Sequence, residues 1–123
     1  MELFIFKQGP LHMSDIVEEE IVDLNNIGKP LTERAAVASK FANQVRKMML
    51  DLYFGGIDIP LRLMGSTSQV ESFMKALGRE KRYMDSYIKN GLDNPKTMKS
   101  KYSLNRAVES FEKETGLRWP FKN

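Results

Sequence analysis

The apolar spacing of residues 32–54 constrains the fold more than any other feature of the chain. Five large apolar side chains recur there at intervals of four, four, three and four residues: Val37, Phe41, Val45, Met48 and Leu52. This is the spacing of one face of an α-helix. Thr32 suits the start of this helix and Gly55 its end. At ~1.5 Å per residue the helix spans roughly 33 Å, so it is predicted to be the central core helix.

Three further helices are predicted from caps and stop signals. They are 15–26 behind Ser14, 68–90 before Gly91, and 104–115 before Gly116. A serine at a helix start accepts a backbone N–H, whereas glycine ends helices because it adopts left-handed backbone angles. Asn94 and Pro95 also suit a helix start, and this turn either joins the last helix or stands alone.

Two segments have β character instead. Residues 57–64 alternate apolar and other side chains with a period of two, and residues 2–7 are apolar and β-prone. Pro60 lacks a backbone N–H and therefore favours an edge strand. The segment 57–64 either pairs with the first residues or is an extended connector. The predicted fold is thus mainly α, a compact bundle of about four helices with at most one short two-stranded β element.

The chain length predicts one domain. A chain of 123 residues holds one modest hydrophobic core, so 13–123 is expected to be a single helical domain. Residues 1–12 resemble the remnant of a cloning vector cut by a 3C-type protease, because Gln8 precedes Gly9 and Pro10. They are interpreted either as such a remnant or as a short strand. His12, the only histidine, falls inside this stretch.

The residue inventory argues against catalysis. The chain has no cysteine, which excludes disulfides, thiolate metal sites and cysteine nucleophiles, and agrees with a cytoplasmic location. With one histidine, the usual route for activating a serine is missing. No pair of carboxylates falls in a predicted pocket, so neither an enzyme nor a cofactor or metal site is expected. No apolar run approaches the ~18 residues of a membrane span, so no membrane contact is expected either.

The helix predicted over 68–90 sorts its charges by face. On a wheel of ~100° per residue measured from Leu77, six apolar residues fall within about 60°: Val70, Phe73, Met74, Leu77, Met84 and Ile88. Opposite them, at roughly 120–200°, lie Lys75, Arg79, Arg82 and Lys89. Glu71 is the sole acidic residue on that side. An ordinary solvated face would mix both signs, so this one-sided basic face predicts contact with phosphates.

The basic character continues past Gly91. Three lysines follow, namely Lys96, Lys99 and Lys101. Three tyrosines are interleaved with the basic residues and could stack on unpaired bases, although tyrosines more often pack at core margins: Tyr83, Tyr87 and Tyr102. By contrast, residues 1–33 hold seven acidic and two basic residues. An acidic first segment could cover the basic helix within one chain or between two chains.

Two weaker motifs accompany the basic helix. Ser66, Thr67 and Ser68 precede it and could hold an anion at the helix start, but their spacing to Gln69 and Glu71 is that of a capping box. A helix-turn-helix can be drawn through 94–116 with 104–114 as the reading helix, although its turn lacks a glycine.

The sequence therefore predicts a small non-enzymatic nucleic-acid-binding protein that grips the DNA or RNA backbone. Its expected contacts are Lys75, Arg79, Arg82, Lys89, Lys96, Lys99 and Lys101. The alternative is a protein–protein interaction module, either an oligomeric assembly factor or an inhibitor. It would use the acidic N-terminal and basic central helices to dock an acidic partner or another copy. A small, basic, cysteine-free helical chain also fits accessory proteins of viruses or mobile elements.

Overall fold

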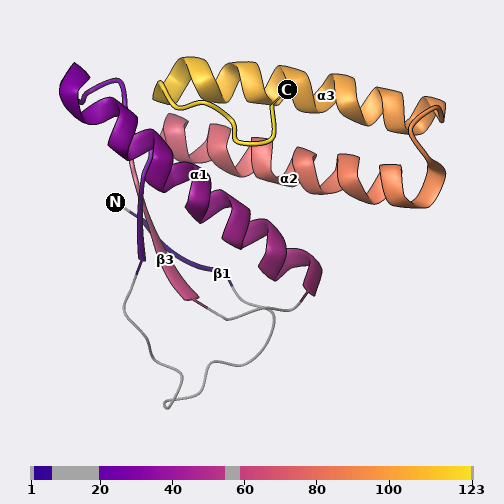
Figure 1. Cartoon of the computed structure of the whole chain (residues 1–123), viewed down its shortest axis with the longest axis horizontal. Coiled ribbons are helices and arrows are strands. Elements are labelled where there is room, and N and C mark those ends of the chain that lie inside the picture. Colours follow the sequence, from indigo (N-terminus) through magenta and orange to yellow (C-terminus); the bar gives the residue numbers. More distant parts are fainter. Residues whose placement is uncertain (1, 7–19, 55–58, 123) are drawn as a thin grey trace, which may run out of the picture.

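The computed structural model describes residues 2–6, 20–54 and 59–122, and the side chains of 20–51 and 62–122. The elements follow the order β1 (Glu2–Phe6), β2 (Glu20–Asp23), α1 (Leu31–Phe54), β3 (Ile59–Met64), α2 (Thr67–Asn90) and α3 (Pro95–Thr115). The mainly helical class is confirmed. The described residues hold three helices and three strands, rather than about four helices and two strands (Figure 1).

The prediction of a helix over 15–26 is wrong for residues 20–26, the part of this range that the structure describes. Glu20–Asp23 form strand β2, which runs parallel to β3 with Val22 opposite Leu63. Ile21 and Val22 are β-branched, and a partner strand outweighs a short helical pattern. Residues 14–19, with the proposed cap at Ser14, lie outside the described residues. The strand is also fixed to α1, because the Gln44 Nε2 donates to the Ile21 carbonyl at 2.8 Å.

The three strands form a sheet in the order β1-β3-β2. Pairing of the first residues with 59–64 is confirmed, since β1 runs antiparallel to β3. The prediction that Pro60 places its strand at an edge is wrong, because β3 is the central strand. Pro60 is tolerated there because the parallel pairing with β2 begins one residue later, at Leu61. Residues 7–12, the rest of the suspected vector remnant, lie outside the described residues.

The ends of α2 and α3 follow the capping rules, whereas the start of α1 differs from the prediction. α1 begins at Leu31, so Thr32 lies in its first turn rather than capping it. Ser66 caps α2, and Gly91, at φ 84°, ends it. Asn94 caps α3, whose first residue is Pro95. α3 then continues without a break to Thr115, so the turn after Asn94 joins the last helix and the helix-turn-helix is wrong.

Four aromatic rings, one from each of the three helices and one from the segment after α3, form the centre of the core. Phe41 of α1 stacks on Phe111 of α3 at 5.5 Å and meets Phe73 of α2 edge-on at 5.9 Å. Trp119, beyond α3, packs edge-on against Phe111 at 5.3 Å. Leu117 and Trp119 are both buried, so the C-terminal segment (residues 117–122) closes over the core.

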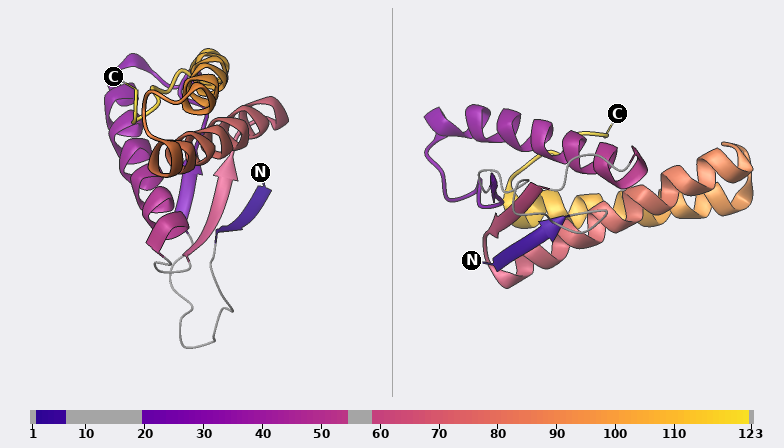
Figure 2. Two further views of the ribbon diagram at one scale, coloured as in Figure 1. Left: turned by 90° about the vertical axis from the view of Figure 1, so that its right-hand side faces the viewer. Right: turned by 90° about the horizontal axis from the view of Figure 1, so that it is seen from below.

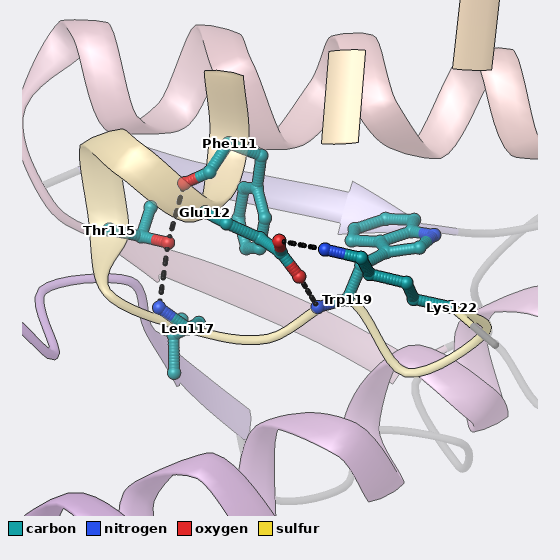
Figure 3. A network of polar contacts seen from close by, with 6 residues as sticks. All are labelled: Phe111, Glu112, Thr115, Leu117, Trp119 and Lys122. Atoms are coloured by element: carbon teal, nitrogen blue, oxygen red, sulfur yellow. Dashed lines mark hydrogen bonds and ion pairs between the residues drawn. The ribbon is translucent and has the colours of Figure 1, made fainter. Parts of the chain in front are cut away.

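Polar contacts fasten this C-terminal segment to α3, as Figure 3 shows. The Glu112 carboxylate accepts from the Trp119 backbone N–H at 2.9 Å and pairs with the Lys122 Nζ at 2.8 Å. The Thr115 hydroxyl donates to the Phe111 carbonyl and accepts from the Leu117 N–H. The chain can therefore turn sharply after α3 without leaving these buried groups unpaired.

α2 and α3 form an antiparallel hairpin that extends well past the end of α1 (Figures 1 and 2). Between Glu80 and Leu104 only Thr97 is buried. We call this outer part of the hairpin, residues 81–103, the arm. The prediction that Ile88 faces the core is wrong, since its side chain is 74% exposed because neither α1 nor the sheet reaches that far.

Candidate nucleic-acid interface

The basic face of α2 is present, but its members differ in exposure. Lys75, Arg82 and Lys89 are exposed, whereas Arg79 is half-buried. The Arg79 Nη1 donates to the Ser103 hydroxyl of α3, so this guanidinium is part of the contact between the helices. The helical wheel shows which residues of α2 point away from its apolar stripe. It does not show that α3 packs against part of that side, so it does not predict this contact.

Further contacts along the same line hold α2 against α3. The Ser86 and Thr97 hydroxyls lie 3.0 Å apart, and Thr97 is fully buried. At the other end of the hairpin, Ser68 donates to the Glu114 carboxylate at 2.9 Å. Because these polar side chains are small, the two helices can approach closely. The charged residues beside them on both helices therefore lie at the rim of the contact.

The Arg79–Ser103 contact brings two basic rows to the same rim. Lys96, Lys99 and Ser103 lie at i, i+3 and i+7, so they share one side of α3. That side adjoins the α2 row through Arg79. Five exposed basic residues thus form one surface, which we call the basic ridge: Lys75, Arg82, Lys89, Lys96 and Lys99.

Lys101 is separated from the basic ridge. It lies two residues before Ser103, and residues two apart on a helix are roughly 200° apart. Its ammonium group sits over the Tyr83 ring, 4.9 Å from the ring centre. The seven basic residues predicted to bind phosphate therefore fall into three groups, with five on the ridge, Arg79 in the helix contact and Lys101 on the opposite flank.

The hydroxyl groups at the start of α2 act as a cap. The Ser66 hydroxyl accepts from the Gln69 N–H at 3.1 Å, and the Gln69 Oε1 accepts from the Ser66 N–H at 2.9 Å. This reciprocal pair is the predicted capping box. Ser68 is occupied by a carboxylate and Thr67 is exposed. The arrangement favours the structural role of these three residues over anion binding.

A buried carboxylate, Glu80, was missed by the sequence reasoning. It is 3% exposed, and the Trp119 Nε1 donates to its Oε1 at 2.7 Å. Burial raises the pKa of this carboxyl, while the Trp119 hydrogen bond and the charge of Lys101 lower the same pKa by less. The signal was present in the sequence, since Glu80 lies ~60° from Leu77 and hence within the core stripe.

Two hollows lie along the flank of α3 that carries Lys101. One, of about 350 Å³, has Glu80, Trp119 and Phe121 in its lining. The other, of about 440 Å³, lies on the arm and is lined largely by Tyr83, Leu92, Met98 and Tyr102. Both linings include Lys101 and Asn105, so the hollows adjoin.

The described residues contain no group of three or more histidine, aspartate or glutamate side chains that could hold a metal ion. Among the helices of the described part of the chain, none is long and apolar enough to cross a membrane. Comparison of the chain with protein-family models, with curated proteins and with solved structures finds no match.

Proposed function

We propose that this protein binds nucleic acid without chemical catalysis and grips the phosphate backbone through the basic ridge. The observation that carries the proposal is that the five ridge side chains are exposed and have no polar partner among the described residues. Cations held in a row without acidic partners attract a polyanion, and a protruding arm can present them to one.

The dimensions of the ridge suit several phosphates. Lys75 and Lys89 are 14 residues apart on α2, which corresponds to ~21 Å. Lys96 and Lys99 extend the same surface onto α3. Contact with four or five phosphates predicts an affinity that falls with a log–log salt slope of about −4. Side chains that grip phosphates in this way read little sequence, so the proposed binding is directed at the backbone.

A charge-reversal experiment tests the ridge. We expect the triple variant Lys75→Glu, Arg82→Glu and Lys89→Glu to lose more than tenfold in affinity for DNA or RNA at low salt and to flatten the salt dependence. The three side chains are exposed, so the fold should persist, which circular dichroism would check. The matched control reverses three exposed lysines elsewhere: Lys40→Glu, Lys47→Glu and Lys113→Glu.

The outcomes are distinct. Equal losses in the two triple variants would mean that net charge, and not the ridge, attracts the polymer. Failure of the wild-type chain to retain any nucleic acid at low salt would reject the proposal altogether.

A second candidate, a protein–protein module, is favoured by the apolar residues at the end of the arm. Tyr87, Ile88, Leu92 and Met98 are exposed there, and clustered exposed apolar side chains often mark an interface. Docking through an acidic N-terminal helix, as predicted from the sequence, does not hold for residues 20–23, because they form a strand. Sedimentation of the nucleic-acid-free protein tests the candidate, because a module of this kind would form oligomers or require a protein partner.

A further inference from the structure

The hollow on the arm combines aromatic, apolar and basic walls in an exposed position. Tyr102 is 66% exposed, and Met98 and Leu92 are exposed beside it. Tyr83 lies deeper, with the Lys101 ammonium over its ring. The volume of the hollow, about 440 Å³, falls in the ~300–1,000 Å³ range of sites for small organic groups.

We infer that this hollow receives an unpaired base, so that the preferred target is single-stranded nucleic acid. The inference rests on the proposed function and names its substrate class. Every base has a flat π-face that stacks on aromatic rings, and this stacking tolerates any sequence. In a duplex the bases are stacked on one another, and reaching such a hollow would require flipping one out.

The ridge and the hollow are adjacent along α3. Lys99 belongs to the ridge and Tyr102 to the lip of the hollow, and they lie at i and i+3, with Cβ atoms ~5–6 Å apart. A strand whose phosphate contacts Lys99 therefore holds the neighbouring base near Tyr102. The Arg106 guanidinium lies over the Tyr102 ring, 6.0 Å from its centre, and helps to keep the ring in place.

The charges around the hollow suit a nucleotide. Lys101 is in its wall and Lys99 lies one helical turn from Tyr102, whereas Asp93 is the one acidic residue of the lining. The Asn105 side chain also lines it and offers both a donor and an acceptor to the edge of a base. Cations near the backbone and a stacking ring for the base are the combination found at single-strand sites, and the amide can add a hydrogen bond to the base edge.

The test uses the full chain and a single-stranded oligonucleotide that contains 2-aminopurine, whose fluorescence falls when it stacks. We expect Tyr102→Ala to weaken single-strand binding about tenfold and to abolish the quenching, whereas Tyr102→Phe retains both. Duplex binding should not change. Tyr87→Ala is the matched control, because Tyr87 is an exposed tyrosine of the arm outside the lining of the hollow.

The results separate the inference from the function beneath it. Equal affinity for single strands and duplexes, with no effect of Tyr102→Ala, would overturn the inferred base site. If the triple charge reversal of the ridge still lowered affinity in that case, the proposed function would stand. Loss of self-association in Tyr102→Ala without nucleic acid, seen by sedimentation, would assign the hollow to a second copy of the chain and overturn the inference. Absence of all nucleic-acid binding would reject the inference together with the proposed function.

Discussion

A single buried carboxylate, Glu80, connects the C-terminal segment to α2. Its Oε1 accepts a hydrogen bond from the indole N–H of Trp119 at 2.7 Å. The two residues are far apart in the sequence, but both side chains are buried in the same core. A buried carboxylate without such a donor would cost several kcal/mol, so the hydrogen bond makes the burial tolerable. It also fixes the orientation of the indole ring between Phe73 and Phe111.

The raised pKa of Glu80 predicts a pH-dependent stability. The folded state holds the Glu80 proton more tightly than the unfolded chain, whose carboxyl has a pKa near the ordinary value of 4.5. Stability from this group is therefore full below the unfolded pKa and is lost as pH rises through the folded pKa. We expect Glu80→Gln, which keeps an acceptor for Trp119, to gain stability relative to wild type as pH rises from about 4.5 toward 7.

Chemical denaturation at a series of pH values measures this difference. Glu71→Gln is the matched control, since Glu71 is an exposed carboxylate on the same helix. A constant difference between Glu80→Gln and wild type over this range would contradict the assignment of a raised pKa.

The helices show which elements can be derived from the sequence. The spacing of Phe41, Val45 and Met48 predicted α1 because a long apolar stripe fits no other period, and all three are buried. Gly91 and Gly116 predicted two helix ends correctly, because both adopt positive φ angles. The segment 20–23 could not be assigned in this way, since four residues carry little periodicity and only the pairing with β3 decides their state.

Two glycines, one in α2 and one after α3, are predicted to respond oppositely to alanine. Gly116 has a φ of 74°, and a Cβ there would come within 2.8 Å of the Ile27 side chain and 3.1 Å of its backbone nitrogen. Gly116→Ala should therefore destabilise the protein by at least ~1 kcal/mol. Gly78 lies mid-helix, and a Cβ added there would meet no atom within 4 Å, so Gly78→Ala should stabilise by ~0.5–1 kcal/mol.

Thermal or urea unfolding of the two variants provides the measurement. Because the same substitution is made in both, the contrast in sign depends on backbone geometry and local space alone. Equal effects of the two substitutions would contradict the left-handed cap at Gly116.

On the scale of the whole molecule, the candidate interface was only partly visible in the sequence. The wheel placed Lys75, Arg82 and Lys89 on the outer side correctly, because exposure opposite an apolar stripe follows from helix geometry. It also placed Arg79 on that side, where α3 in fact packs, and it did not extend to Lys101, which lies on α3 against Tyr83. Ile88 follows the helical period but is exposed, because the period says nothing of where α1 ends.

The core depends on Trp119 in the C-terminal segment. Trp119 is 1% exposed and contacts the rings of Phe73, Phe111 and Phe121. We expect Trp119→Ala to cost ~3–5 kcal/mol, a large part of the ~5–15 kcal/mol that stabilises a typical domain. Urea unfolding would measure the loss. A cost below ~1 kcal/mol would contradict the packing of the C-terminal segment.

The burial of Trp119 has a practical consequence for spectroscopy. It is the only tryptophan among 123 residues, whereas three of the four tyrosines, Tyr83, Tyr87 and Tyr102, lie on the arm. Indole emission therefore reports on the closing of the core by the C-terminal segment, far from the exposed tyrosines at the tip of the arm. Unfolding can thus be followed through a single intrinsic fluorophore and without an added label.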